Sequence, residues 1–102
     1  MPIRVGEYRF EGPFKFVKMV RNAPGIYAVH YYRDGQYFLL DIGEEVALHD
    51  ALSAHPNQSE WERFGRGMLT FSVLYTGTHS DEERRAVVQE LRAAYEPACG
   101  PR

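Results

Sequence analysis

The strongest structural signal in this chain is GIYAVHYYRDGQYFLLDIG, residues 25–43. Both halves of the segment are rich in aromatic and β-branched residues, which favour strands, and Asp34-Gly35 lies between them. An Asp-Gly pair between two such runs is typical of a two-residue hairpin turn. The segment therefore predicts one strand from Gly25 to Arg33 and a returning strand from Gln36 to Ile42.

Two helical segments are predicted after this hairpin. Apolar residues in the stretch 44–55 recur at three- and four-residue intervals, which is helical spacing, and Pro56 is expected to end that helix. Residues 57–64 are expected to form a short helical turn. Its larger apolar side chains, Trp61 and Phe64, are expected to face the core.

The C-terminal third predicts a strand and a longer helix. Apolar and polar residues alternate over residues 68–76, which is the period of a strand. Ser80-Asp81-Glu82-Glu83 is a capping box, and the helix that it begins is expected to run to Tyr95. The side chains expected to face the core are Val87, Val88, Leu91, Ala94 and Tyr95. These elements predict a small α/β sandwich with a central three-stranded, mostly antiparallel sheet flanked by helices.

Length and composition indicate a single small core. The chain has 102 residues, of which 44% are hydrophobic, and one cysteine, Cys99, so an intramolecular disulfide is excluded. We expect Cys99 to have a packing role. No apolar run approaches the length of about 20 residues that spans a membrane, and the N-terminus does not resemble a signal peptide. A cytoplasmic protein without a membrane association is expected.

Charge is unevenly distributed along the chain. The first 33 residues carry six basic and two acidic side chains, whereas residues 34–62 carry seven acidic side chains and no lysine or arginine. Residues 1–23 are expected to be a basic, extended lead-in packed on a domain formed by residues 24–102. Because phosphates attract cationic groups, the acidic middle segment predicts weak or absent nucleic-acid binding.

Two tripeptides point to a known family. Gly25-Ile26-Tyr27 and Asp41-Ile42-Gly43 lie on the two strands of the predicted hairpin, and a helix is predicted after the second. With the order strand, strand, helix, strand, helix and the proline-containing stretch after the last helix, residues 24–100 resemble a GIY-YIG nuclease-superfamily domain. The second tripeptide departs from the family, because Asp41 stands where the family has tyrosine. The resemblance therefore implies a degenerate member.

The resemblance also implies where catalytic residues would lie. Active members use tyrosines of both tripeptides, an arginine that holds the scissile phosphate and a glutamate that binds a divalent metal. Tyr27 supplies the first tyrosine, and Asp41 replaces the second. The arginine position falls on Ala51 and the glutamate position on Val88, while His55 lies where relatives often have histidine. Alanine cannot grip a phosphate and valine cannot bind a metal.

Other residues could replace the missing arginine and the missing glutamate. Arg84 and Arg85 lie one helical turn before the glutamate position, although we expect them to be exposed and paired with nearby acids. Asp41, Glu44 and Glu45 would suit Mg²⁺ or Mn²⁺ if nuclease activity survived, but acids at this place more often interact with a helix N-terminus. No metal site and no cofactor are expected otherwise.

The predicted hairpin carries a surplus of aromatic residues. Tyr31, Tyr32, Tyr37 and Phe38 flank its turn. Such rings serve as a stacking platform for bases, as a partner-binding face, or as part of the core. We expect the core role, with the lead-in covering them.

Three functions remain open from the sequence. The first, which we favour, is a catalytically impaired GIY-YIG-like domain that acts as a binding or regulatory module. The second is a metal-dependent endonuclease with rearranged catalytic residues: Tyr27, Asp41, Glu44, Arg84 and His55. The third is a protein-interaction domain that contacts a basic partner through the acidic segment 34–62.

Overall fold

The predicted hairpin is present in the computed structural model, which describes residues 3–99. Strands β3 (Gly25–Arg33) and β4 (Gln36–Glu45) pair antiparallel, and Tyr27 lies opposite Gly43. Both turn residues have positive φ, 51° at Asp34 and 79° at Gly35, as a two-residue type I′ turn requires. Strand β4 continues three residues beyond the predicted end, to Glu45.

The sheet has five strands instead of the predicted three. Strands β1 (Ile3–Val5) and β2 (Tyr8–Phe14) form an N-terminal hairpin, and β2 pairs with β5 (Met68–Tyr75). The order is β1-β2-β5-β3-β4, and every pairing is antiparallel. The three-strand prediction was wrong because the broken alternation of the N-terminal stretch concealed two strands. The ends of the predicted segments 1–23 and 24–102, at residues 1–2 and 100–102, lie outside the described residues.

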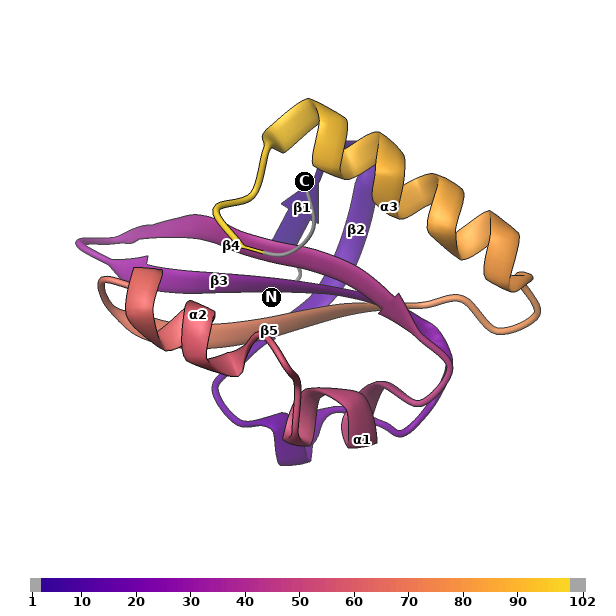
Figure 1. Ribbon diagram of the computed structural model, residues 1–102, viewed down its shortest axis with the longest axis horizontal. Helices are drawn as coiled ribbons and strands as arrows, with labels where there is room; N and C mark the ends of the chain where they lie inside the picture. The colour runs from indigo at the N-terminus through magenta and orange to yellow at the C-terminus, as the bar shows by residue number, and fades with distance from the viewer. Residues whose placement is uncertain (1–2, 100–102) are drawn as a thin grey trace.

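Helices cover both faces of the sheet (Figure 1). Helix α3 (Asp81–Tyr95) lies on one side, and the short helices α1 (Leu48–Ser53) and α2 (Gln58–Phe64) lie on the other. A 3₁₀ turn, η1 (Val17–Met19), lies beside α1. Because β4 runs to Glu45, the predicted helix of residues 44–55 shrinks to α1. No helix within residues 3–99 has the length and apolarity needed to cross a membrane.

Alternate residues of the central strands contribute to two apolar clusters. The cluster under α1 and α2 contains Val20, Tyr27, Val29, Leu40, Leu48, Leu52, Trp61, Phe71, Val73 and Cys99. The cluster under α3 contains Val5, Phe10, Ile26, Ala28, Ile42 and Leu91. The burial of Cys99 agrees with its expected packing role.

Several side chains expected in the core are exposed. Phe64 is 42% exposed at the end of α2, and Tyr95 is 49% exposed at the end of α3. Ala94 is also exposed, whereas Leu91 is buried and Val87 and Val88 are half-buried. The helix itself begins as predicted, because the Ser80 hydroxyl accepts a hydrogen bond from Glu83 N and the Glu83 carboxylate accepts one from Ser80 N.

Candidate functional site

The two tripeptides meet in the sheet, and Tyr27 packs across Gly43. A Cβ atom at Gly43 would overlap the phenol ring and hydroxyl of Tyr27. The strands therefore need glycine at this position, since the ring occupies the space that any side chain would take. The tyrosine of the first tripeptide and the glycine of the second form one packing unit.

His55 fixes the orientation of the Tyr27 hydroxyl. The distance from Tyr27 Oη to His55 Nε2 is 2.7 Å, and Asn57 N donates to His55 Nδ1 over 3.0 Å. Because a backbone N–H can only donate, Nδ1 accepts, and the proton of the neutral ring lies on Nε2. His55 therefore donates to the Tyr27 oxygen and leaves the phenol proton for another acceptor.

Both members of this pair are held in their neutral forms. Burial raises the pKa of Tyr27, and the nearby Asp41 carboxylate raises it further. Burial lowers the pKa of His55, and Asp41 partly opposes that shift. At neutral pH, Tyr27 is consequently a hydrogen-bond donor and not a phenolate.

Asp41, the first residue of the second tripeptide, is part of the buried framework. It is 1% exposed and accepts three hydrogen bonds. Trp61 Nε1 donates to Oδ2 over 2.9 Å, Asn57 Nδ2 donates to the same oxygen over 3.1 Å, and Arg92 Nη1 donates to Oδ1 over 2.9 Å. A buried carboxylate with three donors is well satisfied. Asp41 thereby ties β4 to α2 and α3.

Sequence reasoning missed Arg92, which also links α3 to the edge of β4. Besides Asp41, it donates to the backbone oxygens of Ile42, over 2.6 Å, and Cys99. One signal for this partner was present, because an acid within an apolar strand must find a cation if the strand is buried. Arg92 lies four residues after Val88, on the same face of the helix as that position.

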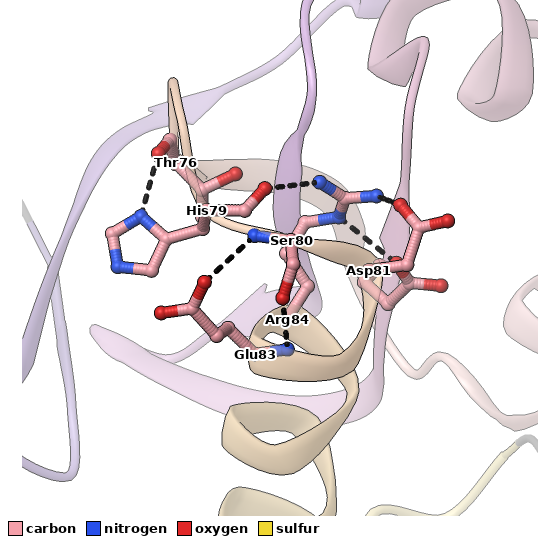
Figure 2. A network of polar contacts seen from close by, with 7 residues as sticks. Thr76, His79, Ser80, Asp81, Glu83 and Arg84 are labelled. Carbon is pink, nitrogen blue, oxygen red and sulfur yellow. Dashed lines mark hydrogen bonds and ion pairs between the residues drawn. The ribbon is translucent and has the colours of Figure 1, made fainter.

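Glu44 and Arg84 satisfy each other at the N-terminal end of α3. Arg84 is 3% exposed, and its Nε donates to Glu44 Oε1 over 2.9 Å. Figure 2 shows its remaining contacts, with the backbone oxygen of His79 and the carboxylate of Asp81. The hydrogen bond with Glu44 raises the pKa of Arg84. The expected exposure of Arg84 was wrong, because a carboxylate from a distant strand reaches it.

The acids after Ile42 do not lie in the first turn of the following helix, where they were expected. Glu44 and Glu45 belong to β4, and α1 begins only at Leu48. Burial raises the pKa of Glu45, and the neighbouring Glu44 adds to that shift. Within residues 3–99, no three His, Cys, Asp or Glu side chains are grouped in a way that would hold a metal ion.

A cleft of about 770 Å³ lies between α3 and β4. It is lined by Tyr27, Ile42, Gly43, Glu44, Arg85, Val88, Gln89, Arg92, Ala93, Glu96 and Pro97. Two arginines and two glutamates give its wall a balanced charge, and Gln89 adds a neutral polar side chain. The formal charges of the residues that line the cleft therefore cancel.

The structure brings only some of the sequence candidates together. Tyr27, Glu44 and Val88 line the cleft. His55 contacts Tyr27 from behind, on the side of α1 and α2, and is not in the wall. Ala51 lies half-buried on α1, also outside the cleft, so Ala51 and Val88 do not line the same space.

Comparisons of this chain with family models, curated proteins and solved structures gave no match.

Proposed function

We propose that this chain is a non-catalytic binding domain on a GIY-YIG-like scaffold, with the cleft between α3 and β4 as its binding site. The resemblance of the two tripeptides supports the scaffold. The composition of the cleft supports binding, because it combines an apolar base around Val88 with the polar groups of Tyr27, Arg85 and Gln89.

The state of the Asp41 carboxylate supports a domain that is not catalytic. Asp41 replaces the second tyrosine and is buried, and its carboxylate is occupied by Arg92, Trp61 and Asn57. A carboxylate in that state is not available to bind a metal or to activate water. The substitution therefore exchanged a catalytic position for a structural one, while Ala51 and Val88 remove the phosphate grip and the metal ligand.

The cleft also supports the second candidate, a metal-dependent endonuclease with rearranged residues. Tyr27 and Arg85 line the same space, so a phenol donor and a guanidinium are available to one ligand. A phosphate oxygen would accept from both groups. Glu44 would have to leave Arg84 before it could bind Mg²⁺ or Mn²⁺.

A cleavage assay separates these two candidates. Plasmid and single-stranded and double-stranded oligonucleotides are incubated with the protein and Mg²⁺ or Mn²⁺, and Tyr27→Phe and Arg85→Ala are run beside the wild type. We expect no cleavage by any form. Metal-dependent cutting that Tyr27→Phe abolishes would replace the binding proposal with the endonuclease.

Binding in the cleft is tested with selected peptides. A displayed peptide library is screened against the wild type, and the amide resonances that move with a selected peptide are mapped. We expect the largest shifts at Gly43, Glu44 and Gln89. Arg85→Glu should weaken binding at least tenfold, while Arg66→Glu, which removes an arginine outside the cleft, should not. Shifts confined to other elements would refute the assignment of the site.

A further inference from the structure

Strand β4 is an edge of the sheet, and residues 3–99 cover its C-terminal half on the outer side but not residues 36–39. Cys99 N donates to Leu40 O over 2.7 Å, and Arg92 Nη1 donates to Ile42 O over 2.6 Å. Within the part of the chain that the structure describes, no backbone or side-chain group outside β3 hydrogen-bonds to residues 36–39. Figure 1 shows this end of the hairpin extending away from α3.

The hairpin turn determines which groups face outward. In a two-residue hairpin, the pair next to the turn is hydrogen-bonded, and here that pair is Arg33 and Gln36. The alternation of an antiparallel ladder then directs the N–H and C=O of Tyr37 away from β3. These unpaired groups are a template for another strand.

This part of the edge lacks the features that usually prevent strand pairing. Residues 35–40 contain no charged residue and no proline. Their side chains include Tyr37, 44% exposed, and Phe38, 39% exposed, and Tyr32 on the adjacent strand is 37% exposed. The expectation that the hairpin's rings belong to the core was wrong for these three, whereas Tyr31 is half-buried against the cluster under α1 and α2. The opposite edge, β1, has three residues and an exposed arginine at its centre, which is how edges are commonly protected.

The rings are arranged in pairs that leave the free edge open. Tyr32 and Tyr37 have ring centroids 4.8 Å apart on one face, and Tyr31 and Phe38 stack at 4.9 Å on the other. A strand added to β4 would therefore contact an aromatic pair on each face of the sheet.

We propose that the free half of β4 pairs antiparallel with the same segment of a second copy of this chain, across a two-fold axis near Tyr37. An antiparallel edge is self-complementary under such an axis. Tyr37 of each copy would exchange two backbone hydrogen bonds with its counterpart, and the two sheets would continue as one of ten strands. The dimer would place its two clefts on separate copies, since neither copy's cleft includes residues 36–39.

The charges around the hairpin end favour a second copy over a polyanion. The two charged residues next to the turn, Arg33 and Asp34, have opposite signs and form an exposed ion pair, with Arg33 Nε 3.5 Å from Asp34 Oδ2. Such a mixed surface does not repel its own copy. Stacking of single-stranded nucleic acid on the same rings would require an excess of cationic groups that this end of the molecule does not have.

Sedimentation of the whole chain tests the dimer over a range of concentrations. We expect twice the 11.8 kDa mass of one chain, with a dissociation constant of roughly 10–100 µM because the interface is small. Tyr37→Lys, which places a charge on the edge, should restore the single-chain mass. Phe16→Lys, which removes a 59% exposed ring next to η1, should leave the dimer intact.

Hydrogen exchange in the wild type tests the dimer even if Tyr37→Lys does not fold. Hydrogen exchange at the amide of Tyr37 should slow as the protein concentration rises, while exchange at the amide of Arg4 on β1 should not. A single-chain mass at about 1 mM, a dimer that persists in a folded Tyr37→Lys variant, or a dimer that Phe16→Lys also abolishes would each overturn the proposal. Binding of a single-stranded oligonucleotide that protects Tyr37 while the protein remains a monomer would overturn it as well.

Discussion

Replacing Asp41 with asparagine would test whether this residue is structural. The substitution keeps the shape of the side chain but removes its charge and turns one of its two acceptor atoms into a donor. The asparagine amide can then accept from Arg92 or from Trp61 and Asn57, but not from all three. At least one buried donor loses its partner.

The magnitude follows from the burial of the ion pair. Removing one partner of a buried pair costs about 3–5 kcal/mol. Arg92 is 14% exposed and keeps the carbonyls of Ile42 and Cys99, so the low end of that range applies. We expect Asp41→Asn to lower the free energy of unfolding by about 3 kcal/mol, which corresponds to a fall in Tm of roughly 12–24 °C for a domain of this size.

Urea unfolding followed by the fluorescence of Trp61, the single tryptophan, measures this change. Asp34→Asn is the matched control. Its side chain is 88% exposed and its positive φ suits asparagine, so we expect a change within about 0.5 kcal/mol. Combining Asp41→Asn with Arg92→Gln should cost less than the sum of the two single changes, because they remove one shared interaction. A loss below about 1 kcal/mol for Asp41→Asn, or additive losses, would refute the structural role.

Three further changes have defined outcomes. Gly43→Ala should lower the free energy of unfolding in urea by about 2–3 kcal/mol, because its methyl group displaces the Tyr27 ring. An unchanged urea midpoint would show that the ring does not lie across the glycine. Burial lowers the pKa of His30 to about 4, so its contribution to stability is present above pH 6.5 and is lost as the pH falls through 4. Between pH 6.5 and 4, the free energy of unfolding of His30→Leu should therefore fall by about 3 kcal/mol less than that of the wild type. Equal falls in the two proteins would contradict the lowered pKa. Ser80→Ala removes the acceptor for Glu83 N and should cost about 1 kcal/mol of unfolding free energy, whereas no change in thermal unfolding would mean that the cap contributes nothing.

The features that the sequence predicted well are local. Asp34-Gly35 between two strand-forming runs determined the β3–β4 hairpin, because the turn's backbone angles are a property of those two residues. The capping box at Ser80 determined where α3 begins, for the same reason. Alternation alone identified β5 within one residue of its observed end at Tyr75.

The sequence identified only some of the residues that form the candidate site. Tyr27 and Glu44 were both among the predicted catalytic candidates, and both line the cleft. Arg92 was not identified, because its role depends on a carboxylate 51 residues away. Arg84 was misplaced in solvent for the same reason, since its partner Glu44 is 40 residues away.

By itself, the sequence determined the hairpin and the start of the last helix, since these depend on residue identity and short-range geometry. The tertiary structure alone decided that two N-terminal strands enlarge the sheet, that Asp41 is buried against Arg92, and that Tyr37 is exposed on an edge strand. The physical reason is that burial and ion pairing are set by contacts between distant segments. Local propensity and periodicity show which face of an element is apolar, but not which segment covers it.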